Sequence, residues 1–304
     1  MNHIFRIDFT SALDAAAPRL RHAFEAPCTV LAARALNEVR PVLDAVHAAA
    51  QRGQWCVGYV RYEAAPAFDT ALQTHAADGP LAWFAVYDHP QPWPPHALPP
   101  APADAAEMTW GEGLAREDFD AALARIQRAI AAGELYQVNY TAPFTGQLRH
   151  GGAEALFAAL HRAQPGGYAA YLDAGEEQVL SVSPELFFDW RDAPVGGHIL
   201  ARPMKGTAPR GATPAQDAAH AEHLRTAPKE RAENVMIVDL LRNDLSRIAL
   251  PHTVQVTALF HTEPLPTVWQ MTSDVAARTR PGTTLADVFA ALFPCGSVTG
   301  APKV

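Results

Sequence analysis

The sequence contains few cysteines and no segment typical of a secreted or membrane protein. Its 304 residues include only Cys28, Cys56 and Cys295, an odd number spread far apart. Such cysteines are better interpreted as reduced packing residues than as disulfides or zinc ligands. No apolar run approaches membrane-spanning length, and the first residues lack the basic and apolar regions of a signal peptide. We therefore expect a cytoplasmic protein without a membrane partner.

Positive charge is also scarce. The chain has 24 Lys and Arg against 32 Asp and Glu, a formal net charge of −8. Because it shows no basic stripe, we expect no nucleic-acid partner. The 13 histidines show no paired spacing of metal ligands, which disfavours a zinc site. The chain also lacks a glycine-rich turn between strand and helix, which disfavours a Rossmann or P-loop enzyme.

The composition is that of a globular protein, with 49% apolar and 18% charged residues. Seven prolines lie between residues 90 and 102, and such a run can neither continue a helix nor form a central strand. We therefore predict an N-terminal region at 1–89, a proline-rich connector at 90–105, and a larger region at 106–304.

Hydrophobic periodicity predicts helices and strands that follow one another in groups. Helices are expected at 37–51, 119–130, around 156–160, 226–248 and 285–292. Strands are expected at 55–62, 136–141, 168–172, 178–182, 186–190, 254–260 and 268–275. Strands joined by short turns and grouped between helices indicate an α+β protein with antiparallel sheets.

Two carboxylates are spaced to share one face of a helix. Glu230 and Glu233 are three residues apart, and together they could offer oxygen ligands to Mg²⁺. The alternative is an exposed helix face on which Lys229 and Arg231 make weak surface pairs. The apolar run that starts at Val235 places Glu233 near the edge of the core, where a carboxylate needs a cation or hydrogen-bond donors.

Two further residues stand in unusual local settings. Lys205 follows a proline by two residues and precedes Gly206, in a run that is typical of a turn. This setting suits either a solvated loop lysine or a nucleophile held at a fixed angle. Glu185, in Ser183-Pro184-Glu185, lies between two predicted strands, either as a turn carboxylate in water or as a general acid in a pocket.

Several motifs, taken in order, resemble the chorismate-utilising enzymes, which include anthranilate, aminodeoxychorismate, isochorismate and salicylate synthases. The resemblance covers roughly residues 107–304 and implies an α+β fold of two large antiparallel sheets packed face to face, with helices outside. Residues 106–304 would then be the chorismate-binding catalytic region. The matching runs are Glu134 to Asn139, Ser183-Pro184-Glu185, Lys205-Gly206-Thr207, Glu230 to Leu245 and Gly296 to Lys303.

Three positions resemble the aminodeoxychorismate synthase branch of the family. A lysine at position 205 and Asn234 differ from the alanine and histidine usual in anthranilate synthases. The water-adding members carry a lysine where this chain has Gln137. The resemblance thus implies conversion of chorismate and ammonia to 4-amino-4-deoxychorismate, for para-aminobenzoate and folate synthesis. Anthranilate synthase and an inactive fragment of such an enzyme are the alternatives.

The resemblance also implies roles for individual residues. Mg²⁺ would be held by Glu233 with Glu230 nearby, and Glu185 would protonate the departing hydroxyl. Lys205, as a neutral amine, would add covalently to the ring before ammonia displaces it. Ammonia would come from a separate glutamine amidotransferase subunit. The expected substrate contacts are Gly206, Thr207, Gln270, Ser297 and Thr299.

The chain departs from its relatives at two points. Gln270 stands where many relatives carry a substrate-facing histidine, so it can donate hydrogen bonds there but cannot titrate. The sequence given stops at Val304, within the Gly-Ala-Pro-Lys motif, whereas relatives continue well beyond it. We expect residues 1–304 alone to leave sheet edges unpaired, to expose apolar surface and to show little synthase activity.

Overall fold

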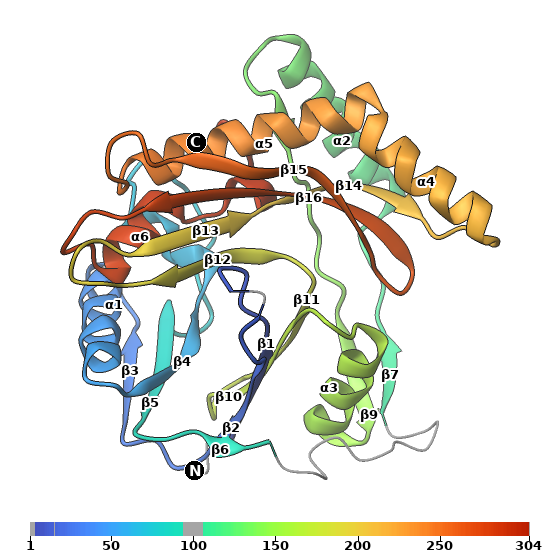
Figure 1. The fold of residues 1–304 in the computed structure, drawn as a ribbon. Helices are drawn as coiled ribbons and strands as arrows, with labels where there is room; N and C mark the ends of the chain where they lie inside the picture. The colour runs from blue at the N-terminus through green and yellow to red at the C-terminus, as the bar shows by residue number, and fades with distance from the viewer. Residues whose placement is uncertain (1–3, 15, 94–105, 304) are drawn as a thin grey trace.

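The computed structural model describes residues 4–14, 16–93 and 106–303 and confirms an α+β architecture with antiparallel sheets (Figure 1). The first sheet has the strand order β11-β10-β1-β2-β6. Its strands are β1 (Phe5–Phe9), β2 (Leu20–Phe24), β6 (Gln91–Pro92), β10 (Tyr168–Asp173) and β11 (Gln178–Ser183). The chain thus returns after about 160 residues to pair β10 with β1.

A small three-stranded sheet packs face to face on the first sheet. It consists of β3 (Thr29–Ala33), β5 (Ala82–Tyr87) and β4 (Trp55–Val60). Phe5 and Phe24 of the first sheet share a core with Trp83 and Tyr87 of the small sheet. Helix α1 (Leu36–Gln51) packs against the small sheet through the buried side chains of Val39 and Leu43, and η1 (Tyr62–Ala67) follows β4.

The second large sheet lies beneath the longest helix (Figure 1). Its strands are β12 (Leu186–Arg191), β13 (His198–Arg202), β16 (Val268–Arg278) and β14 (Met204–Pro209), with β15 (Gln255–Pro264) paired to β16. Helices α4 (Pro214–Thr226) and α5 (Pro228–Ser246) contact β14 and β16. Ile237, Leu241 and Leu245 of α5 form one core with α6 (Leu285–Leu292) and the sheet.

The remaining elements are short or peripheral. Strands β7 (Glu107–Trp110) and β9 (Gly146–His150) pair with each other, as do β8 (Gln137–Val138) and β17 (Gly300–Ala301). Helix α2 (Arg116–Ala131) precedes β8, α3 (Gly152–Ala163) packs on the first sheet, and η2 (Gly296–Val298) precedes β17.

All five helices predicted from periodicity are confirmed, as α1, α2, α3, α5 and α6. The strand predicted at 136–141 is wrong beyond Gln137–Val138, because its partner β17 is only two residues long. The run around Lys205, predicted to be a turn, is strand β14. Helix α4 was not predicted, since it buries little besides Leu224 and so lacks an apolar stripe.

The division at residues 89 and 105 stays a prediction. Most of the predicted connector, residues 94–105, lies outside the described residues. Strands β1 and β2 of the predicted N-terminal region share a sheet with β10 and β11. Among the helices of the described residues, none is both long and apolar enough to cross a membrane.

Candidate active site

Lys205 lies in a strand that bulges at the next residue. The pairing of β14 with β16 shifts register between Met204 and Thr207, and Gly206 adopts a φ of 94°. Only glycine takes this conformation without strain. The bulge leaves the Lys205 side chain half-buried, with its Nζ 3.2 Å from Oδ1 of Asn139. The lysine is therefore held by the protein rather than free in solvent.

Glu185 lies between β11 and β12, as the sequence predicted, and its side chain is held in place. Its Oε1 accepts hydrogen bonds from Oγ of Ser297 at 2.6 Å and from the backbone N–H of Met204 at 3.3 Å. The Ser183 hydroxyl closes the turn by accepting from the Glu185 N–H at 3.1 Å. This carboxyl group is partly buried and oriented, so the solvated-turn alternative does not describe it.

Glu230 and Glu233 lie on the first two turns of α5, and both side chains are partly buried. Oε2 of Glu230 lies 3.1 Å from the position a Cβ would occupy at Gly206, so a glycine lets this carboxylate approach the bulge. Oε1 of Glu233 accepts from Nε2 of Gln137 at 3.3 Å. Nζ of Lys229 lies 3.9 Å from Oε1 of Glu230. Both carboxylates are partly buried rather than fully exposed, although the weak Lys229–Glu230 surface pair of the alternative interpretation is present.

These two carboxylates fit a hard cation that keeps most of its water. Their ligand atoms are oxygens, and their present partners are one amide and one distant ammonium group. Within the described part of the chain, no group of three or more His, Cys, Asp or Glu side chains could enclose a metal ion. A divalent ion here would thus need water and substrate to complete its coordination.

The expected substrate contacts differ in their surroundings. Ser297 is 4% exposed and donates to Glu185, whereas the Thr299 hydroxyl donates to the Cys295 carbonyl at 3.0 Å. Thr207 is exposed and pairs in register with Gln270 of β16. Gln270 and Thr272 lie on the opposite face of the strand from Trp269 and Met271, as predicted, since the latter two pack under α4.

Two adjoining cavities are lined by three of the predicted site residues, Glu185, Ser297 and Thr299, but neither has Lys205, Glu230 or Glu233 in its walls. One, of about 660 Å³, is lined by Gln137, Asn139 and Thr299 among others. The other, of about 320 Å³, is lined by Glu185 and Ser297 together with apolar side chains. Both include Tyr62 and Val298 in their walls, so they adjoin. The site lies where the β8–β17 pair, β14 and α5 come together.

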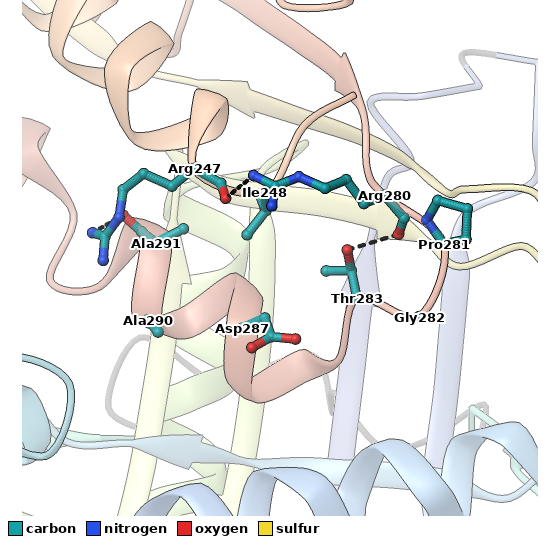
Figure 2. A pocket seen from close by; sticks show the side chains of 9 residues that line it. All are labelled: Arg247, Ile248, Arg280, Pro281, Gly282, Thr283, Asp287, Ala290 and Ala291. Carbon is teal, nitrogen blue, oxygen red and sulfur yellow. Dashed lines mark hydrogen bonds between the residues drawn. The ribbon is translucent and has the colours of Figure 1, made fainter. Parts of the chain in front are cut away.

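Another cavity, of about 350 Å³, contains none of the predicted site residues (Figure 2). Arg280 donates there to the carbonyls of Arg247 and Ala249, and Arg247 donates to the carbonyl of Ala291 at 3.4 Å. These arginines satisfy backbone carbonyls at the end of α5 and near α6. Their arrangement is explained by structure, and we assign no chemistry to this cavity.

The structure adds two residues to which the sequence assigned no role. Asn139 joins Lys205 to the C-terminal motif, and Lys303 lies 2.6 Å from Oδ2 of the buried Asp244 while donating to the Leu292 carbonyl. Both stand inside the motifs quoted above, but the contacts of Asn139 with Lys205 and of Lys303 with Asp244 join residues more than 50 positions apart and leave no local signal. Burial raises the pKa of the neighbouring Cys295 thiol, so this cysteine stays neutral and packs as predicted.

Comparison with known proteins gives the site its context. Residues 11–304 match the family model described as chorismate binding enzyme. Aminodeoxychorismate synthase component 1 of Klebsiella aerogenes is 41% identical over 222 residues, which cover 72% of this chain and 48% of that protein. Anthranilate synthase component 1 of Aeropyrum pernix is 38% identical over 232 residues, covering 73% of this chain and 51% of the relative.

A solved structure has the same fold. Anthranilate synthase component I from Streptococcus pneumoniae superposes with a TM-score of 0.68 at 21% identity, covering 100% of this chain and 75% of the other. The chain thus spans about half the length of the curated relatives it matches. The family model covers nearly the whole chain, including every predicted site residue. The chain therefore belongs to the chorismate binding enzyme family.

Proposed function

We propose that this chain carries the catalytic core of an aminodeoxychorismate synthase component I, which forms 4-amino-4-deoxychorismate from chorismate and ammonia. One observation carries the proposal. An amine, Lys205, and a carboxyl group, Glu185, are both partly buried and are joined through Asn139 and Ser297. A nucleophile and an acid held at one site are what displacement of a ring hydroxyl requires.

The chemistry begins with addition to the ring. The neutral Lys205 amine forms a C–N bond to chorismate while the ring double bonds shift and the ring hydroxyl departs. Glu185 supplies the proton with which that hydroxyl leaves as water, and the lysine nitrogen loses one proton. Ser297 and the Met204 N–H hold the Glu185 carboxyl group during this step.

The second step restores the lysine. Ammonia attacks the carbon that lost the hydroxyl, the double bonds shift back, and the bond to Lys205 breaks as its nitrogen regains a proton. Chorismate and ammonia are thereby converted to 4-amino-4-deoxychorismate and one water. Gln137, an amide that cannot act as a base toward water, supports amination over hydroxylation.

Mg²⁺ belongs to the proposal, with Glu233 and Glu230 as its protein ligands. When bound, it would neutralise the charge of the chorismate ring carboxylate. Gly206 lies at the bulge next to Glu230, and Thr207 is the exposed residue that follows it, which supports both as proposed substrate contacts. We include Gln270, Ser297 and Thr299 among the proposed substrate contacts.

We also propose an amidotransferase partner and a cytoplasmic location for this chain. A separate glutamine amidotransferase subunit would supply ammonia, because no cysteine here has the setting of an amidotransferase nucleophile. Burial raises the pKa of Cys56 to about 11 and also raises that of Cys295. All three cysteines are free thiols, which supports a reducing, cytoplasmic location.

Anthranilate synthase is the second candidate, and the similarity to the Aeropyrum pernix enzyme favours it. Product analysis separates the two. Purified chain is incubated with chorismate, Mg²⁺ and an ammonium salt, and products are resolved by chromatography. We expect 4-amino-4-deoxychorismate, at low turnover, and its loss in Lys205→Ala. Anthranilate as the main product would overturn the proposal in favour of the second candidate.

If no product forms, the chain is either a poorly active synthase or an inactive fragment. Calorimetric titration with chorismate, with and without Mg²⁺, then tests whether the chorismate site is intact. Binding that depends on Mg²⁺ supports an intact chorismate site. Absence of binding under both conditions would contradict the proposed function for residues 1–304.

A further inference from the structure

We propose that Asn139 is a positioning residue that fixes the Lys205 amine relative to Glu185. Its catalytic meaning rests on the proposed function, whereas its geometry stands independently of it. Asn139 lies directly after β8. Its side chain makes one contact with Lys205 of β14 and one with Ser297 of the C-terminal motif. Three hydrogen bonds run in series from Lys205 through Asn139 and Ser297 to Glu185, at 3.2, 2.7 and 2.6 Å.

The backbone of Asn139 is anchored to the C-terminal motif through its N–H. Its N–H donates to the Thr299 carbonyl at 2.8 Å, which extends the pairing of Val138 with Gly300. Gly300 permits this approach, since a Cβ there would lie 2.5 Å from the Gln137 carbonyl oxygen. The side chain of Asn139 therefore leaves a fixed point of the chain rather than a free loop.

The direction of the Asn139 amide is set by chemistry. The Ser297 carbonyl can only accept a hydrogen bond, so the NH₂ group of Asn139 must face it, with Nδ2 at 2.7 Å. The amide oxygen then points to Lys205, whose amine donates to it at 3.2 Å. An amide flip would set the Asn139 oxygen against the Ser297 carbonyl oxygen and break that contact, so the Ser297 contact specifies the orientation.

A neutral acceptor suits a lysine that must react. Among the described residues, no carboxylate oxygen lies within 4.0 Å of the Lys205 Nζ, which distinguishes it from Lys303 on Asp244. An amide oxygen accepts from a neutral amine and from an ammonium group alike, whereas a carboxylate would hold the ammonium form. Asn139 can therefore hold Lys205 in place without fixing its charge.

The chain provides its own reference for a test, because Lys205, Lys229 and Lys303 are its only lysines. Trace acetic anhydride labels the folded protein, and peptide mass spectrometry gives the acetylation ratio of Lys205 to Lys229, whose side chain is 87% exposed. Asn139→Ala removes the acceptor and should raise this ratio about fivefold. Asn139→Asp supplies a charged acceptor and should lower it about tenfold.

Opposite shifts in the two variants would distinguish positioning from a general loosening of the fold. Asn243→Ala, at an exposed asparagine of α5, is the control and should leave the ratio unchanged. A ratio within twofold of the parent in both Asn139 variants would overturn the proposal. If Asn139→Ala does not fold, Asn139→Asp decides alone, with a lowered ratio as support and an unchanged or raised ratio as contradiction.

The labelling needs no chorismate, so its outcome is independent of product identity. With chorismate and Mg²⁺ added, the positioning role predicts chorismate affinity close to the parent's in Asn139→Ala. Covalent addition to Lys205 should be about ten- to a hundredfold slower. Loss of affinity with an unchanged rate of addition would assign Asn139 to substrate binding instead.

Discussion

Gly206 sets how closely helix α5 approaches the strand that carries Lys205. Its φ is 94°, and a Cβ there would lie 3.1 Å from both Oε2 of Glu230 and Cδ1 of Leu224. An added methyl group would thus strain the backbone and displace the carboxylate. Because Gly206 has no side chain, the predicted metal ligand Glu230 can approach the bulge.

Gly206→Ala should destabilise the fold by about 1–3 kcal/mol and weaken Mg²⁺-dependent chorismate binding. Urea unfolding and calorimetry measure the two effects. Gly133→Ala is the matched control, because Gly133 has a φ of 77° but no heavy atom within 4 Å of the added Cβ. Equal destabilisation in both variants would mean that crowding at Glu230 contributes nothing.

The cysteines should differ in reactivity. Burial raises the pKa of Cys56 to about 11 and also raises that of Cys295, whereas Cys28 is exposed. The thiolate is the reactive form, and its fraction rises with pH, so a raised pKa delays alkylation. At pH 8, iodoacetamide should modify Cys28 well before Cys56 and Cys295, as peptide mapping would show. Equal rates at the three sites would contradict the buried placement.

At the scale of elements, α5 is fixed to the second large sheet by a buried polar contact. Asn234 is fully buried, and its Oδ1 accepts from Oγ of Ser273 in β16 at 2.6 Å. The same hydroxyl accepts from the N–H of Phe260, which has a φ of 59°, at 3.2 Å. The guanidinium of Arg231 lies 4.3 Å from the Phe260 ring centroid. These contacts determine how α5 presents Glu230 and Glu233.

Ser273→Ala should cost about 1–3 kcal/mol of unfolding free energy, because it leaves a buried amide oxygen and a backbone N–H without partners. A double-mutant cycle with Asn234→Ala, measured by urea unfolding, should show coupling of about 0.5 kcal/mol or more. Strictly additive effects would show that the two side chains do not stabilise each other.

Elements with a clear hydrophobic periodicity were predicted from the sequence. Elements whose structure depends on pairing with residues far away in the chain were missed. Helix α5 carries an apolar run, so its extent and the placement of Glu233 at the edge of the core were predictable. The strand around Lys205 was predicted to be a turn, since the proline and glycine nearby are turn residues. Its strand character depends on β16, more than 60 residues away. Likewise, no local pattern shows that Asn139 meets Lys205.

At the scale of the whole molecule, the chain exposes a group of apolar side chains around one hollow of about 360 Å³. Phe119, Tyr140 and Phe144 contribute to its lining, and Phe144 is 74% exposed. Exposed apolar surface of this kind binds hydrophobic dyes and promotes association. This hollow was not predicted from the sequence, because its walls come from α2 and the segment after β8, which no local pattern brings together.

Phe144→Ser should lower the fluorescence of bound anilinonaphthalene sulfonate and reduce self-association in sedimentation velocity. Val195→Ser is the control, because Val195 is similarly exposed, at 72%, but lies in the connection between β12 and β13. An equal effect of both substitutions would contradict a localised apolar surface.

Covalent addition of Lys205 to chorismate is the central step of the proposed reaction. Purified chain is incubated with chorismate and Mg²⁺ without ammonia, digested, and analysed by peptide mass spectrometry. We predict a mass gain equal to chorismate minus one water on Lys205, absent from Lys229 and Lys303 and lost in Glu185→Gln. Chorismate binding with Lys205 unmodified, or unchanged amination by Lys205→Ala, would contradict the account.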